Sequence, residues 1–272
     1  MKLEDEMQLA AEYAQGCFLA GTIGDVGVLL FNQPHKRNAI SQEMWEGLRS
    51  AADGFAADPA IRVVVIAGTG GQAFASGNDI SQFAERRSNA EANIAFMRTM
   101  ASGRASLSTM AKPTIACIQG FCLGGGLATA LLADLRVADR SAVFGIPAAR
   151  LGIAYGIDET QDLVAAVGPS RARLMLYTAR RFDATEANTM GLVDVLADDA
   201  ASETLALAQT VAGNAPLSVE AAKFSVAQAQ EPPHERDAAK LLEMRRRCID
   251  SADYREGREA FMAKRKPVFT GS

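Results

Sequence analysis

The 272-residue chain contains few of the residues that build metal sites and disulfide frameworks. Its two histidines, His35 and His234, are too few for a multi-histidine metal site. Its four cysteines are scattered without a C-x-x-C pair, which excludes a disulfide-dense scaffold and the common zinc motifs. We therefore expect no bound metal.

The chain also lacks an excess of basic charge and any long apolar run. Its net charge is -4, so no bulk attraction to nucleic acid or to anionic membranes is expected. No apolar stretch reaches the roughly 18 residues that span a bilayer. The acidic, polar residues 1–8 are unlike a signal or transit peptide. These absences predict a cytoplasmic protein that binds neither nucleic acid nor membranes.

The composition is that of an ordinary globular protein, and the sequence predicts a clear order of strands and helices. Hydrophobic residues make up 49% of the chain and charged residues 22%. Continuous β-branched runs predict strands buried on both faces, and residues at helical spacing after Ser41, a good N-cap, predict a helix. The alternation of strands and helices predicts an α/β fold with parallel strands. The expected strands lie at 18–31 (a hairpin broken at Gly24-Asp25), 62–67, 114–118, 135–138 and 192–196, and the expected helices begin at 42, 94 and 124.

Three segments have less regular patterns. Residues 2–15 are expected to form a loose arm or a short helix, and residues 68–79 a loop. The last 70 residues are expected to be helical. This helical end has an apolar stripe that covers either the chain's own core or a neighbouring subunit: Leu241, Leu242, Met244, Cys248 and Ile249.

Two glycine-rich turns follow predicted strands. Residues 68–73 fit G-x-G-x-x-A, but residues 74–79 have no apolar helical face, so the pattern is weak support for dinucleotide binding. Neither turn ends in the Gly-Lys-Ser/Thr of a phosphate P-loop. Residues 120–126 join a strand to a helix, and their backbone N–H groups would suit an anionic oxygen. A tight turn chosen for steric reasons alone is the alternative.

Several motifs, in a fixed order, resemble one family. The chain is similar to the crotonase (enoyl-CoA hydratase/isomerase) superfamily from about residue 17 to 269. The motifs that carry the resemblance are F-N-Q-P-H-K-R-N-A-I-S at 31–41, F-A-S-G-N-D-I at 74–80, K-P-T-I-A-C-I-Q-G-F-C-L-G-G-G-L-A at 112–128, F-G-I-P at 144–147, A-N-T-M-G-L-V-D-V at 187–195 and the segment 256–268.

The resemblance implies an architecture and an assembly. It implies an α/β, crotonase-like spiral of ββα units with an α-helical C-terminal trimerisation region. The corresponding divisions are an N-terminal arm at 1–16, a crotonase core that binds acyl-CoA at 17–200 and a helical C-terminal region at 201–272. The protein is accordingly expected to form a homotrimer or a dimer of trimers.

The resemblance also implies a ligand and a set of site residues. The substrate is expected to be an acyl-coenzyme A, with coenzyme A as part of the substrate and no prosthetic group. The backbone N–H groups of Ser76 and Gly125 are expected to form an oxyanion hole, which would stabilise the negative charge of a thioester enolate. Further residues are expected around the acyl-CoA, with the basic ones near its phosphates: Lys36, Arg37, Ala39, Ala75, Gly77, Asn78, Asp79, Ile80, Lys264 and Lys266.

The chain departs from the family at its acid–base residues. Alanine occupies both positions where the hydratases carry glutamate, at Ala128 and Ala148, and alanine transfers no proton. Tyr155, Asp158 and Glu159 replace a proline and two glycines nearby, which makes them the candidate catalytic residues. The leading interpretation is an enzyme of the hydratase/isomerase family. A decarboxylase or isomerase that uses Tyr155 or the Asp158/Glu159 pair, and a non-catalytic acyl-CoA-binding homologue, are the alternatives.

Overall fold

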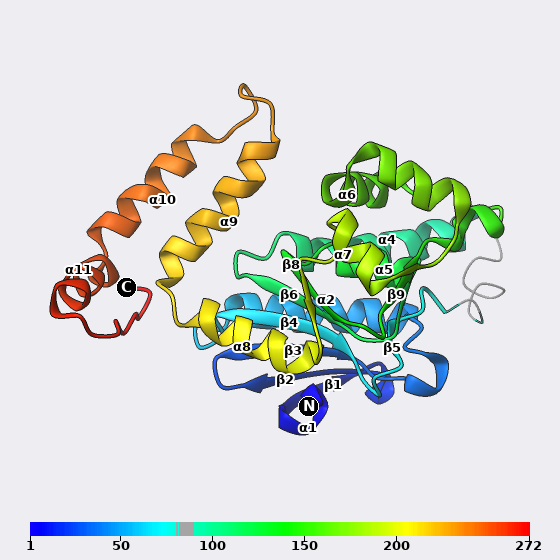
Figure 1. Ribbon diagram of the computed structural model, residues 1–272, viewed down its shortest axis with the longest axis horizontal. Helices are drawn as coiled ribbons and strands as arrows, with labels where there is room; N and C mark the ends of the chain where they lie inside the picture. The colour runs from blue at the N-terminus through cyan, green and yellow to red at the C-terminus, as the bar shows by residue number, and fades with distance from the viewer. Residues whose placement is uncertain (80, 82–89) are drawn as a thin grey trace.

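The computed structural model describes residues 1–79, 81 and 90–272. Within this part of the chain, two sheets are flanked by helices, and a group of C-terminal helices projects away from them (Figure 1). The larger sheet has the strand order β1-β2-β3-β4-β6-β8-β11, and the smaller has the order β10-β9-β7-β5.

The strands are β1 (Gln8–Tyr13), β2 (Phe18–Ile23), β3 (Val26–Phe31), β4 (Val63–Gly68), β5 (Ala73–Ala75), β6 (Thr114–Ile118), β7 (Phe121–Leu123), β8 (Leu135–Asp139), β9 (Val143–Gly145), β10 (Phe182–Asp183) and β11 (Val195–Ala197). The α-helices are α1 (Leu3–Glu6), α2 (Gln42–Ala57), α4 (Ala90–Ser108), α5 (Gly125–Ala130), α6 (Ile157–Thr178), α7 (Ala184–Met190), α8 (Ala200–Ala212), α9 (Pro216–Gln230), α10 (Ala238–Asp250) and α11 (Ala252–Ala263). Short 3-10 helices lie at Ala14–Gly16, Pro34–Lys36 and Pro147–Arg150.

The larger sheet forms where the sequence has its strongest apolar runs. β2 and β3 pair as the predicted antiparallel hairpin, and β3, β4, β6, β8 and β11 then pair in parallel. Every residue of β3 and β6 is buried, because helices cover one face of the sheet and the smaller sheet and α2 cover the other. The predicted hairpin and buried strands are confirmed.

The predicted helix after Ser41 is also confirmed. The hydroxyl of Ser41 accepts a hydrogen bond from the backbone N–H of Met44 at 3.2 Å, which satisfies one of the free donors at the start of α2. Trp45 and Leu48 are buried on the face of α2 that packs into the core. α2 therefore fixes the position of the segment 38–41, which leads into the site.

Several predictions were wrong in detail. Residues 8–13 form the edge strand β1, paired antiparallel with β2, rather than a loose arm or helix. The expected loop at 68–79 contains β5, which pairs with β7 in the smaller sheet. The strands of the smaller sheet are only two or three residues long, too short to show a period in the sequence. The helix after the second glycine-rich turn ends at Ala130, and the strand expected at 192–196 lies at 195–197.

The helical C-terminal end divides into two parts. α8 packs on the larger sheet and buries Ala201, Ala208 and Ala212 there. α9, α10 and α11 project from this body as a separate group (Figure 1). Phe261 and Met262 of α11 are 83% and 81% exposed, which leaves an uncovered apolar surface on the projecting group. In the described part of the chain, no helix combines the length and apolar character needed to cross a membrane.

Candidate active site

A cavity of about 940 Å³ lies between two turns, residues 76–79 and 124–125, α4 and the start of α6; the first glycine-rich turn, residues 68–73, does not line it. Most of the residues predicted from the sequence line it, which brings together segments that are far apart in the chain. The predicted residues in its wall are Lys36, Arg37, Ala39, Ser76, Gly77, Asn78, Asp79, Gly125, Tyr155 and Glu159.

Four of the predicted residues that the structure describes do not line the cavity. Ala75 is buried at the end of β5, and Asp158 is exposed on α6. Lys264 and Lys266 follow α11 in the projecting group, so within one chain they belong to a different region from the cavity. Ile80 lies outside the described residues.

Glycine lets the two turns approach each other closely. Gly124 has φ 50° and ψ -117°, a conformation that side chains disfavour, and it turns the chain from β7 into α5. A Cβ on Gly126 would lie 2.2 Å from the carbonyl oxygen of Ala75, so only glycine lets α5 pack directly on the end of β5. The same packing places Gly125 beside Asn78, where a Cβ on Gly125 would lie 3.4 Å from the Asn78 backbone nitrogen.

The free backbone N–H groups of these turns differ from the expected pair. The Ser76 N–H donates to the carbonyl oxygen of Arg37 at 3.0 Å, and the Ser76 hydroxyl donates to the Lys36 carbonyl at 3.4 Å. The Ser76 amide, expected to donate to substrate, is therefore engaged within the chain in this structure. The backbone N–H groups of Asn78 and Gly125 donate to no group in the residues that the structure covers. Two adjacent free donors thus belong to Asn78 and Gly125.

The side chain of Asn78 has its own partners on the neighbouring helices. Its Oδ1 accepts a hydrogen bond from the indole Nε1 of Trp45 at 3.3 Å, and its Nδ2 lies 3.9 Å from the sulfur of Met100. Trp45 comes from α2 and Met100 from α4, and both line the cavity. These contacts hold the turn between the two helices and leave its backbone N–H exposed to the cavity.

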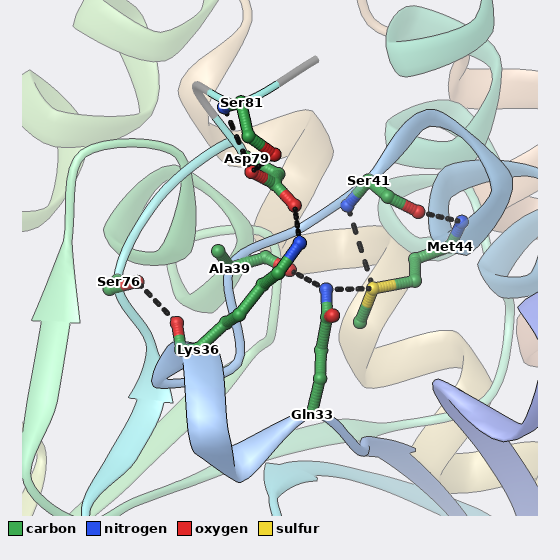
Figure 2. A network of polar contacts seen from close by, with 8 residues as sticks. All are labelled: Gln33, Lys36, Ala39, Ser41, Met44, Ser76, Asp79 and Ser81. Carbon is green, nitrogen blue, oxygen red and sulfur yellow. Dashed lines mark hydrogen bonds and ion pairs between the residues drawn. The ribbon is translucent and has the colours of Figure 1, made fainter.

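The rim of the cavity carries paired charges. Lys36 Nζ lies 2.9 Å from Asp79 Oδ2, and Asp79 Oδ1 accepts from the backbone N–H and hydroxyl of Ser81 (Figure 2). Burial opposes ionisation of Asp79, but the hydrogen bonds from Ser81 and Lys36 outweigh it and lower its pKa below the usual carboxyl value. Asp79 is therefore a charged residue that ties the turn together.

A second basic group, next to Arg37 but outside the cavity lining, was missed by sequence reasoning. The guanidinium of Arg37 lies 4.9 Å from the centre of the Phe121 ring, and that of Arg181 lies 5.3 Å from the same centre. Cationic groups favour the face of an aromatic ring. The adjacent Arg180-Arg181 pair was visible in the sequence, but nothing there placed it beside Phe121.

The wall opposite the turns contains a buried ion pair. Ala128 and Ala148, at the two glutamate positions, both line the cavity. Arg104 of α4 is 8% exposed, and its guanidinium donates to the carbonyl oxygen of Ala128 at 3.2 Å and to Asp162 Oδ2 at 2.7 Å. Burial raises the pKa of Asp162 even though Arg104 opposes the shift. Arg104, which lines the cavity, and Asp162 therefore join α4, α5 and α6; neither was predicted.

The start of α6 separates the predicted carboxylates. Glu159 lines the cavity and is half-buried, whereas Asp158 faces solvent outside it. Glu159 forms no hydrogen bond or ion pair with any residue in the described ranges. Tyr155 also lines the cavity, but its hydroxyl is buried and has no hydrogen-bond partner among the described residues. Burial and the nearby Glu159 raise the pKa of Tyr155 far above its usual value.

Among the described residues, the cavity thus combines two free backbone donors, an apolar chamber and one unpaired carboxylate, that of Glu159. Such a site could hold a carbonyl oxygen on the donors and move a proton near it. Over the residues described, no group of three or more His, Cys, Asp or Glu side chains could hold a metal ion.

Known proteins share this sequence pattern and fold. Residues 22–272 match the family model described as "Enoyl-CoA hydratase/isomerase". The chain is 35% identical over 246 residues to the 2,3-dehydroadipyl-CoA hydratase of Escherichia coli (strain K12), covering 90% of this chain and 94% of that relative. It is 32% identical over 246 residues to the crotonyl-CoA hydratase of Syntrophomonas wolfei, with the same two coverages.

Solved structures agree on the architecture. A crystal structure of an enoyl-CoA hydratase/carnithine racemase from Magnetospirillum magneticum superposes with a TM-score of 0.91 at 33% identity, covering 100% of this chain and 99% of that one. An enoyl-CoA hydratase subunit from Geobacillus kaustophilus gives a TM-score of 0.85 at 33% identity, covering 96% of this chain and 100% of that one. The expected crotonase-like α/β fold is confirmed.

Proposed function

Because this chain belongs to the enoyl-CoA hydratase/isomerase family and is therefore an acyl-CoA thioester enzyme, we propose that it moves a proton along the acyl chain through a thioester enolate, with Glu159 as the proton carrier. The observation that carries this proposal is the unpaired Glu159 carboxylate in the cavity wall, the one found among the described residues, together with alanine at both usual glutamate positions. The reaction class is then isomerisation of a 3-enoyl-CoA to a 2-enoyl-CoA.

The proposed oxyanion hole consists of the backbone N–H groups of Asn78 and Gly125. Both are free of partners among the described residues, and they lie side by side. A thioester oxygen held between them gains negative charge when a proton leaves C2 of the acyl group. Two aimed donors stabilise that charge, and loss of one such donor typically costs about 10²–10³ in rate.

Glu159 is the best-supported proton carrier. Its carboxylate would remove a proton from C2, and the resulting carboxylic acid would return that proton to C4 while the double bond moves from C3–C4 to C2–C3. This cycle needs one acid–base group, whereas the family's hydratases use two glutamates to add water. Tyr155 is a weaker candidate because its hydroxyl is enclosed and burial raises its pKa, so it is neutral at pH 7.

Recognition of the coenzyme A phosphates is assigned to the basic rim. Lys36 and Arg37 line the turn side of the cavity, and Arg181 shares the Phe121 ring with Arg37. An incoming phosphate would compete with Asp79 for Lys36. Lys264 and Lys266 belong to the projecting group, so they would contribute only through assembly of several chains.

The proposed assembly is the homotrimer, or dimer of trimers, that the family resemblance implies. Its support is the apolar surface left uncovered on the projecting helices, where Phe261, Met262 and Val268 are 83%, 81% and 73% exposed. Sedimentation is expected to give a species of three or six chains, and a stable 28.8 kDa monomer at micromolar concentration would contradict this assignment.

Two substrates separate the proposed reaction from hydration. The purified chain should convert a 3-enoyl-CoA, such as 3-hexenoyl-CoA, to the 2-enoyl isomer much faster than it hydrates crotonyl-CoA. Each missing acid–base group lowers a rate by about 10²–10⁴-fold. This factor sets the expected difference between the isomerisation rate and the hydration rate. Rapid crotonyl-CoA hydration would favour the activity named for the relatives. Binding of several acyl-CoA thioesters without turnover would identify a non-catalytic homologue.

A further inference from the structure

Gly156, the residue immediately before α6, has no conformational need to be glycine. Its φ is -68° and its ψ is 159°, which any residue adopts. In this chain the glycine also leaves space for a neighbouring side chain. A Cβ built on Gly156 would lie 2.1 Å from Oε2 of Glu159 and 3.2 Å from its Cδ. The Glu159 carboxylate therefore occupies the volume that a side chain at position 156 would fill.

The helix start explains why these two residues meet. Gly156 is the N-cap of α6 and Glu159 is the third helical residue, and a side chain at that third position folds back toward the N-cap. The carbonyl oxygen of Gly156 accepts from the Thr160 N–H at 3.0 Å and from the Thr160 hydroxyl at 2.6 Å. The backbone of this turn is thus fixed by its own hydrogen bonds, while the Glu159 side chain is the part free to move.

We propose that Gly156 is a positioning residue: the absence of a side chain there keeps the Glu159 carboxylate folded over the first turn of α6, at the cavity wall. This inference rests on the proposed role of Glu159 as the proton carrier. An alanine at 156 would push a flexible carboxylate rather than the backbone, so the fold should survive while the carboxylate moves. A displacement of about 1 Å in a reacting group can cost about 10²-fold in rate.

The experiment compares four chains in the 3-hexenoyl-CoA isomerisation assay: wild type, Gly156→Ala, Glu159→Gln and the double variant. Gly54→Ala is the matched control, because Gly54 lies in α2 with nothing within 4 Å of its added Cβ. We expect Gly156→Ala to lower kcat by about 10²-fold with KM nearly unchanged. In the Glu159→Gln background the same change should cause no further loss, and Gly54→Ala should behave as wild type.

The outcomes separate this inference from the proposed function. Wild-type kcat for Gly156→Ala, or an equal loss in both backgrounds, would overturn the positioning role. A Gly156→Ala chain that fails to fold, by circular dichroism and thermal unfolding, would also overturn it, because only a flexible side chain should have to move. Full activity of Glu159→Gln would instead refute the proposed function itself.

Discussion

The two sides of the cavity are built by different means. On the turn side, residues 73–79 and 121–126, the geometry is set by backbone contacts that need glycine, as at Gly124 and Gly126. On the wall side, Ala128 and residues 146–162, the geometry is set by side chains that depart from the family's usual residues. If the proposed function holds, backbone donors for a thioester oxygen are kept on one side while the proton-transfer residue changes on the other.

The largest expected effect distinguishes two neighbouring carboxylates on the wall side. Glu159→Gln should lower kcat for 3-hexenoyl-CoA isomerisation by about 10²–10⁴-fold, because it removes the proton carrier and keeps the side chain's shape. Asp158→Asn is the control, since Asp158 is exposed and lies outside the cavity. Steady-state kinetics of both variants give the comparison, and an equal loss in both would mean that the negative charge of the helix start matters rather than the carboxylate in the cavity.

The next effect is on stability and concerns the ion pair behind the wall. Arg104→Met should lower the free energy of unfolding by about 3 kcal/mol, because it leaves Asp162 and the Ala128 carbonyl without their buried partner. Adding Asp162→Asn should recover part of this loss, since the uncompensated charge disappears. Urea unfolding of the wild type, Arg104→Met and the double variant measures the three free energies of unfolding. A double variant no more stable than Arg104→Met would show that the unpaired Asp162 charge does not cause the loss of stability.

A smaller effect is expected at Tyr155. Tyr155→Phe should leave kcat nearly unchanged and raise the free energy of unfolding by about 1 kcal/mol, because it removes a buried hydroxyl without a partner among the described residues. The measurements are the isomerisation assay and urea unfolding. A large loss of kcat with an intact fold would instead return Tyr155 to the reaction and favour the decarboxylase alternative.

The smallest effect concerns the projecting helices. Hydrogen bonds from Arg265 and from the Val268 N–H lower the pKa of Glu256 from 4.5 to about 2. A carboxyl whose folded pKa is lowered contributes stability above its unfolded pKa, and that contribution is lost as the pH falls through the folded value. The Val268 amide resonance should therefore shift as the pH falls from about 4.5 toward 2. In Glu256→Gln this shift should be absent.

The main elements of the fold were predictable because their signals are local. Continuous apolar runs gave the strands of the larger sheet, and Ser41 marked the start of α2. β1 was missed because it pairs at the sheet edge with most of its residues exposed, so it lacks alternation. The smaller sheet was missed because its strands of two or three residues exist only through pairing across the chain.

The site was predictable as a region but not at the level of single contacts. The motifs identified both turns, yet the choice between the Ser76 and Asn78 amides depends on where the Arg37 carbonyl lies. The carboxylates at 158 and 159 are adjacent in sequence, and only the direction of α6 decides which one faces the cavity. Arg104 and Asp162 are 58 residues apart in the sequence, and no local pattern predicts that they pair.

The most direct test of the central claim is exchange of the C2 protons of a bound acyl-CoA with D₂O, followed by NMR. This exchange needs an enolate and a proton carrier but no complete reaction, so butyryl-CoA is a suitable probe. The wild-type chain should exchange these protons, and Glu159→Gln should exchange them at least about 10²-fold more slowly, with butyryl-CoA binding unchanged. Exchange at the wild-type rate in Glu159→Gln would contradict the account.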